Sequence, residues 1–115
     1  MIGNINDLLG YEVKSDQAKA ALMKVLVSPQ EGWDGYVMRV LEVGEEGYTP
    51  KHSHPWPHIN FIIEGTGELL IGDEAKKVTS GSYAFVPNDT IHQFRNIGKG
   101  TFKFICIVPE YGHKI

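Results

Sequence analysis

Apolar and polar residues alternate over short stretches along most of the chain. In residues 36–43, for example, Val37, Leu41 and Val43 fall on one side of an extended chain and Glu42 on the other. Alternation with a period of two is typical of half-buried β-strands, because successive side chains point to opposite faces. The pattern predicts strands over residues 20–27, 36–43, 48–54, 58–64, 68–71, 75–79, 83–87, 91–96 and 101–108.

Segments rich in glycine and proline separate most of these strands and predict turns at 44–47, 55–57, 65–67, 72–73, 80–81, 87–89 and 98–100. The first strand has a competing interpretation, because Ser15 is a suitable helix N-cap and residues 16–24 are rich in helix formers. The β-branched and apolar residues up to Val27, with Pro29 soon after, favour a strand. No segment after residue 35 has the sustained period of an amphipathic helix.

Short strands at this spacing indicate an all-β fold, an antiparallel sandwich or barrel. A length of 115 residues is enough for one domain. We place that domain at residues 20–115 and expect an N-terminal arm over residues 1–19, with one short strand near 11–13.

Composition narrows the choice of partners. The formal net charge is -3 and no basic run is present, which argues against a nucleic-acid or anionic-membrane partner. The apolar runs are too short to cross a bilayer, and the N-terminus lacks the basic start and apolar run of a signal peptide. Cys106 is the single cysteine, so no intramolecular disulfide can form. We therefore expect a soluble protein in the reducing cytoplasm.

Four histidines point to a metal site. His52 and His54 are two residues apart, so on a strand both rings point to the same face. His58 follows a stiff turn that can fold the next strand back beside the first, and a barrel can bring His92 to the same place. Neutral imidazole is the commonest ligand for divalent transition metals. The alternative is four ordinary polar residues. We expect the fifth histidine, His113, to be solvated at the C-terminus.

Two segments around these histidines resemble the two sequence motifs of the cupin superfamily. The first is the run Gly47…His52-Ser53-His54…His58…Gly65, and the second is Gly81…Pro87…Asp89…His92…Asn96. The resemblance implies a jelly-roll barrel, the antiparallel double-stranded β-helix of cupins. It also implies a metal bound by His52, His54, His58 and His92, and a homodimer, since small cupins usually pair. The exposed-face residues Ile91, Ile97, Ile105 and Ile107 would suit the dimer interface.

Three positions depart from the cupin motifs. Gly47 stands one residue closer to His52 than the first motif states. Asp89 replaces the glycine of the second motif, which is tolerable because aspartate adopts left-handed backbone conformations more readily than most residues. His58 replaces the usual glutamate ligand, so the chain resembles the small bacterial cupins with an all-histidine site, some of which carry manganese. Four neutral ligands leave the ion its full charge, which makes it a stronger Lewis acid. Manganese is our first expectation, with iron, nickel, copper, cobalt and zinc as alternatives.

Five further residues are candidates for contact with a small-molecule substrate. Phe94, Phe104 and Cys106 lie on the predicted inner face of their strands, although ordinary core packing would explain them too. Arg39 shares a face with apolar residues, so it either anchors a carboxylate or other anion at the pocket mouth, or it forms a structural ion pair or reaches to the barrel rim. Tyr48 shares parity with Pro50 and His52 at the same rim. Trp56, between two prolines, is a candidate lid or interface residue.

Three functions remain open at this point. The first is a metal-dependent enzyme acting on a small molecule, with dioxygenase-like oxidation as the first expectation and isomerisation as the second. Oxidation is favoured because the nearby carboxylates lie at predicted turns, so no side-chain general base is evident. The second is a module that binds or senses a small molecule without turnover. The third is a metal site that only stabilises the fold.

Overall fold

A computed structural model places the chain in nine strands and three short 3-10 helices, and it describes residues 1–113. The strands are β1 (Tyr11–Glu12), β2 (Lys19–Val27), β3 (Tyr36–Tyr48), β4 (His58–Glu64), β5 (Thr66–Ile71), β6 (Glu74–Thr79), β7 (Tyr83–Val86), β8 (His92–Asn96) and β9 (Phe102–Pro109). The 3-10 helices are η1 (Ile5–Asp7), η2 (Pro29–Glu31) and η3 (Glu110–Gly112). None of the helices within these residues is long and apolar enough to cross a membrane.

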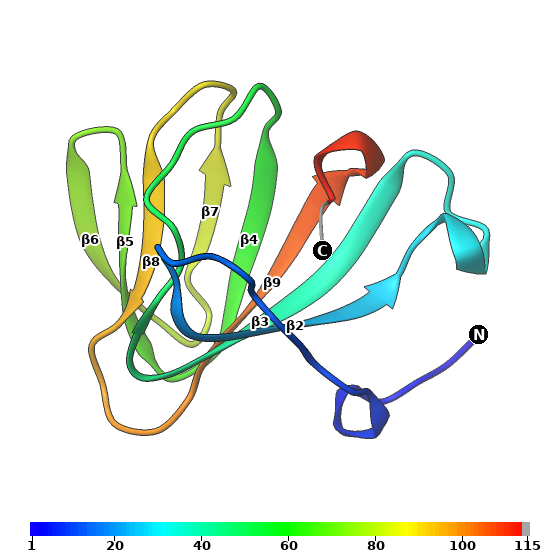
Figure 1. Cartoon of the computed structure of the whole chain (residues 1–115), viewed down its shortest axis with the longest axis horizontal. Coiled ribbons are helices and arrows are strands. Elements are labelled where there is room, and N and C mark those ends of the chain that lie inside the picture. Colours follow the sequence, from blue (N-terminus) through cyan, green and yellow to red (C-terminus); the bar gives the residue numbers. More distant parts are fainter. Residues whose placement is uncertain (114–115) are drawn as a thin grey trace.

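All strands join one curled antiparallel sheet in the order β6-β5-β8-β3-β9-β4-β7, with β2 and β1 added beside β3. Figure 1 shows β5, β6 and β8 on one side of the molecule, β4 and β7 next to them, and β2, β3 and β9 crossing below. The sheet curls far enough for β4 and β6, which are distant in the strand order, to contact each other. The predicted all-β antiparallel fold is confirmed.

Most predicted strands are present within one or two residues of their expected ends, but two details were wrong. The predicted turn at 44–47 is an irregularity inside the long strand β3, where the pairing with β2 jumps from Val43 opposite Ala21 to Tyr48 opposite Lys19. Glu46 takes a positive φ of 61° there, so the strand bends without breaking. The predicted strand 48–54 is mostly a loop, because after Tyr48 the chain forms only one isolated bridge, between His52 and His92.

The core lies on the concave face of the sheet. Phe102, Phe104, Cys106 and Val108 alternate inward along β9 and are at most 3% exposed. The residues between them, Lys103, Ile105 and Ile107, are partly exposed on the outer face, as predicted. Gly67 on β5 packs directly on the ring of Phe102, where a Cβ would lie only 2.3 Å from the ring. The core thus fixes β5 and β9 close together and leaves one open cavity between β3, β4, β8 and β9.

Candidate metal centre

The four predicted ligands come from a loop and two strands. His52 and His54 lie in the loop that follows β3, His58 opens β4 and His92 opens β8. The backbones of His52 and His92 bond to each other in both directions, at 3.2 and 2.9 Å. The carbonyl of His54 accepts from the amide of Asp89 at 2.8 Å, and Asp89 has the left-handed φ of 59° expected for its place in the turn. Backbone bonds therefore hold the loop against β8.

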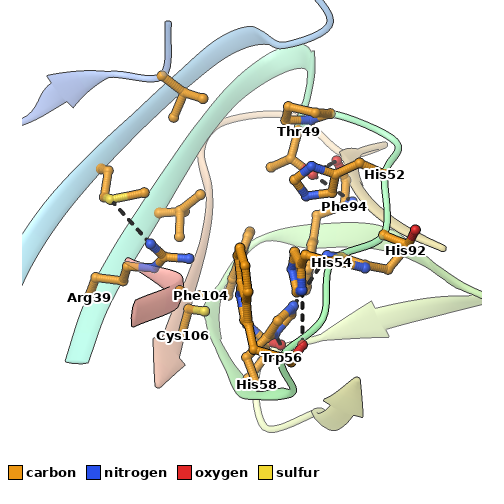
Figure 2. Close-up of a pocket in the computed structure, with 17 residues that line it drawn as sticks. Arg39, Thr49, His52, His54, Trp56, His58, His92, Phe94, Phe104 and Cys106 are labelled. Carbon is orange, nitrogen blue, oxygen red and sulfur yellow. Dashed lines mark hydrogen bonds between the residues drawn. The ribbon is translucent and has the colours of Figure 1, made fainter. Parts of the chain in front are cut away.

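The imidazoles converge on one small volume, which Figure 2 shows at the centre of the cavity. One ring nitrogen each of His52, His54 and His92 lies within 4.8 Å of the others. His58 stands outside this group of three, but its Nε2 is 3.2 Å from Nε2 of His92. Its ring centroid is 5.3 Å from that of His54. The structure thus brings all four predicted histidines together, with three nitrogens mutually close and the fourth beside His92.

Hydrogen bonds on the far side of three rings fix their orientation. The Nδ1–H of His54 donates to the carbonyl of Trp56 at 2.9 Å, and that of His92 donates to the carbonyl of Thr90 at 2.9 Å. His58 donates from Nδ1 to Oδ1 of Asn60 at 2.7 Å. The amide of Asn60 is itself oriented, because its Nδ2 donates to the carbonyl of Ile105 at 3.3 Å. With Nδ1 protonated, each of these neutral rings presents the lone pair of Nε2 to the cavity.

The contact between Nε2 of His58 and Nε2 of His92 is the most informative distance in the site. Both nitrogens carry lone pairs in this arrangement, so they cannot donate to each other across 3.2 Å. Two buried acceptors face one another with no donor between them. A cation placed against both lone pairs would satisfy them, and the donor set therefore matches a divalent metal that prefers imidazole.

Burial keeps the histidines neutral. Burial, together with the neighbouring His92, lowers the pKa of His58 to about 3. Burial also lowers the pKa of His92 to about 4, although the bond to the Thr90 carbonyl opposes this shift. The pKa values of His52 and His54 move in the same direction, again mainly because of burial. Because metal ligation requires the neutral imidazole, this environment favours ligation even in mildly acidic solution.

The histidines line one end of a cavity of about 380 Å³. Phe94, Phe104 and Cys106 line it as well, and the two phenylalanine rings stack with centroids 4.0 Å apart. All three are also core residues at no more than 3% exposure, so they both pack in the core and line the cavity. Trp56 covers the site from the loop, with its indole stacked on the ring of His54 at 4.3 Å.

Two expectations about the cavity were wrong. Tyr48 is not among the lining residues, because it ends β3 in register with Arg95 of β8, and the chain leaves the strand geometry on which the parity argument depended. His113 is not solvated. It is partly buried, and its Nδ1 accepts a hydrogen bond of 3.1 Å from Arg39. The short helix η3 carries the chain back over the cavity, which explains this burial.

Arg39 lines the cavity as predicted. It has no carboxylate partner among residues 1–113, so the structural ion pair offered as the alternative is absent there. Asn60, which orients His58, was missed. Its signal in the sequence is its position two residues after His58, which places both side chains on the same face of β4.

Comparison with known proteins agrees with this geometry. Residues 38–108 match the cupin domain family. An uncharacterized protein of Methanocaldococcus jannaschii is 30% identical over 76 residues, which is 65% of this chain but only 60% of that protein. The polyketide cyclase RemF of Streptomyces resistomycificus superposes with a TM-score of 0.85 at 27% identity, covering 96% of this chain and 80% of RemF. A cupin 2 conserved barrel protein of Rhodopseudomonas palustris gives 0.78 at 28%, covering 89% and 70%. The chain belongs to the cupin family.

Proposed function

We propose that this cupin binds one divalent transition metal through His52, His54, His58 and His92 and uses it to transform a small molecule. The observation that carries the proposal is the pair of Nε2 atoms of His58 and His92, which face each other at 3.2 Å with both lone pairs free. The fixed tautomers and the lowered pKa values support the same ligand set.

Manganese is the metal we propose first, with iron, nickel, copper, cobalt and zinc as the alternatives. Intrinsic affinity for imidazole rises from manganese to copper, so a preference for manganese has to come from geometry and supply. Four ligands leave two positions open on a six-coordinate ion, whereas a tetrahedral ion would be saturated. When bound, the ion would supply Lewis acidity and, if redox-active, electrons for chemistry with dioxygen.

The side chains around the site are suited to binding a ligand and excluding water, and less suited to transferring protons. The described lining of the cavity contains no aspartate or glutamate. Phe94 and Phe104 form a stacked apolar wall, and Trp56 covers His54. We therefore propose oxidation with dioxygen first and isomerisation second. The likeness to RemF, a polyketide cyclase, supports an enzyme that acts on a small organic molecule. Binding or sensing without turnover is the alternative, since one fold hosts many functions.

A metal titration tests the ligand set. We expect calorimetry with Mn²⁺ and Zn²⁺ to give one site per chain. Replacing His58 or His92 with alanine should lower the affinity at least a hundredfold. His113→Ala is the matched control, because it removes a histidine outside the cluster and should retain the metal. Equal metal content in His92→Ala and in the unmodified protein would contradict the proposed centre.

Turnover is tested separately. The metal-loaded protein is supplied with phenolic and enolic compounds while dioxygen consumption and product formation are followed. We expect activity that disappears in His52→Ala, since His52 is the exposed member of the cluster. Saturable binding of a compound with no product in the presence of each metal would favour the non-catalytic alternative.

We also propose that the chain forms a homodimer through the outer face of β4, β7 and β9. A groove there is lined by eight residues without a charge: Ile59, Asn60, Phe61, Tyr83, Ala84, Phe85, Ile105 and Ile107. Tyr83 is 83% exposed and Phe85 59%. At the opposite edge of the sheet, β6 carries Glu74, Lys76 and Lys77, charges that discourage pairing. An uncharged edge strand such as β7 can meet a second copy of itself across a two-fold axis.

Light scattering tests the dimer. Phe85→Lys should convert it to a monomer, because a lysine would be buried at the centre of the interface. Ile97→Lys is the control, since Ile97 is 50% exposed but lies outside the groove. Of the four isoleucines expected from the sequence at the dimer interface, Ile105 and Ile107 line this groove and Ile91 and Ile97 do not. The proposed interface therefore includes only the first two. A monomeric unmodified protein at micromolar concentration would refute the proposal.

A further inference from the structure

The guanidinium of Arg39 is enclosed by neutral groups. Its Nη1 donates to Nδ1 of His113 at 3.1 Å and contacts Sδ of Met23 at 3.9 Å. Its Nε is buried and has no hydrogen-bond partner. Within residues 1–113 Arg39 has no further hydrogen-bond partner, so no described residue pairs with the edge formed by Nε and Nη2. That edge is the planar fork that carboxylates bind with two parallel hydrogen bonds.

Among the described residues, the cavity around Arg39 also lacks negative charge. Its described lining includes no aspartate or glutamate, and none of the ion pairs within residues 1–113 involves Arg39. Arg39 and the four histidines line the same cavity. Arg39 is partly buried, and a buried Nε without a partner is costly; a ligand that brings an anion removes this cost.

We propose that Arg39 is the anion-binding residue of this cavity and that the natural ligand is a small carboxylic acid. Its carboxylate pairs with the Nε–Nη2 edge, and its apolar body lies against Phe94 and Phe104. Figure 2 shows Arg39 extending from β3 toward the space beside Phe104 and Cys106, across the cavity from the histidines. A second polar group of the same ligand would face the histidine end, and only this part rests on the proposed metal function.

The size of the cavity limits the ligand. A volume of about 380 Å³ holds roughly a dozen water-sized groups at about 30 Å³ each, which suits a molecule with one ring. The wall beside Arg39 is apolar, since Val13, Met23 and Leu41 line the cavity there. The ligand is therefore amphipathic, with an anionic head and a compact apolar body.

The test uses acids and their uncharged isosteres as probes. Benzoate, phenylacetate, 3-phenylpropionate and 4-phenylbutyrate are titrated into the 115-residue chain, each beside its primary amide, with Mn²⁺ present and again after EDTA treatment. We expect at least one acid to bind ten times more tightly than its amide. In Arg39→Gln the dissociation constant of that acid should rise at least tenfold, which corresponds to about 1.4 kcal/mol. The affinity for the amide should stay within about twofold.

Arg95→Gln is the matched control, because Arg95 is exposed on β8 and its loss changes the net charge equally. It should bind acids as the unmodified protein does. Arg39→Gln should bind Mn²⁺ equally or more tightly, since a positive charge near the dication has been removed. A structural role for Arg39 would instead weaken acid, amide and metal binding together, and that result would overturn the proposal. So would equal binding of acids and amides, no binding of any acid, or unchanged acid binding in Arg39→Gln.

The EDTA-treated arm separates this inference from the metal function. If the chain binds no metal, the preference for acids that depends on Arg39 is still measurable in the treated protein. If the chain binds metal but Arg39→Gln leaves acid binding unchanged, the anion site is refuted and the metal centre stands.

Discussion

The two ends of the cavity differ in whether their buried polar groups have hydrogen-bond partners. At the histidine end, three Nδ1–H groups donate to fixed oxygen atoms, so three of the four rings are each held in one orientation. At the arginine end, one guanidinium makes a bond to His113, a long contact to a thioether, and leaves Nε without a partner. The two ends lie in the same cavity and share the apolar wall of Phe94 and Phe104.

This difference indicates which end is complete before a ligand arrives. The histidine end is preorganised, as the proposed metal centre requires, because the supporting bonds come from backbone carbonyls and from Asn60. The arginine end stores an unsatisfied donor, which only a ligand or a rearrangement can satisfy. Changes at the histidine end should therefore strongly lower the free energy of unfolding or the metal affinity. Changes at the arginine end should have little effect on the stability of the ligand-free protein.

The largest expected effect is acid sensitivity of the metal-free protein, and it comes from the histidine end. The pKa values of His58 and His92 are lowered to about 3 and about 4, whereas an unfolded histidine titrates near 6.5. Below pH 6.5 the unfolded chain therefore binds more protons than the folded one, and the free energy of unfolding falls as the pH falls toward 4. The two residues together should remove about 3–5 kcal/mol between pH 6.5 and 4.5.

Urea unfolding at pH 7.5, 6.5, 5.5 and 4.5 measures this loss. His58→Gln removes one of the two groups, so its slope against pH should be smaller by about 1 kcal/mol per pH unit. A free energy of unfolding that is flat between pH 6.5 and 4.5 would mean that these rings are not buried as the structure has them.

The next largest effect is expected from Asn60→Leu. This change removes the acceptor for Nδ1–H of His58, so the ring is free to turn and its buried donor is left without a partner. Loss of such an outer partner typically lowers metal affinity about 10- to 100-fold. Calorimetry with Mn²⁺ measures the affinity, and Asn60→Asp should restore it because a carboxylate also accepts from Nδ1.

Asn96→Leu is the matched control for Asn60→Leu. Asn96 is equally buried, but its amide donates to the carbonyls of Val43 and Gly100, away from the histidines. It should lower the free energy of unfolding without lowering the metal affinity of the folded protein. If both leucine variants weaken metal binding equally, the support of His58 by Asn60 is not specific.

At the arginine end we expect a substitution to stabilise the protein instead of destabilising it. Arg39→Met replaces the unpartnered guanidinium with an apolar chain of similar length beside Met23 and Leu41. Removing a buried donor that has no partner among the described residues often stabilises a protein, so the free energy of unfolding should rise by about 1–2 kcal/mol. Thermal unfolding without ligand tests this. A clear loss of stability would show that the arginine end is already satisfied.

The sequence predicted the strands well because their alternation reflects burial on one face, and burial depends on the local period. His52 and His54 were placed together by strand parity, yet they lie in a loop; they converge because bonds to His92 and Asp89 hold that loop. The same parity argument was wrong for Tyr48. Arg39 and His113 are 74 residues apart in the sequence, and their contact depends on how η3 brings the end of the described chain back over the cavity. No local sequence pattern predicts such a contact.

The smallest expected effect comes from the contact between the two ends, where Gly112 of η3 packs on the indole of Trp56. A Cβ at Gly112 would lie 2.5 Å from Nε1 of Trp56, so in Gly112→Ala either the indole or η3 has to move. Trp56 is stacked on His54, whereas η3 is a single turn near the C-terminus, so we expect η3 to move. The free energy of unfolding should fall by about 1 kcal/mol, the low end of the usual cost of overpacking. Metal affinity should stay within about twofold, because the histidine end is unchanged.

Gly3→Ala is the control, since no atom lies within 4 Å of a Cβ there and nothing should change. If Gly112→Ala weakens metal binding as much as Asn60→Leu does, then the indole has yielded, and the histidine end is the less rigid of the two.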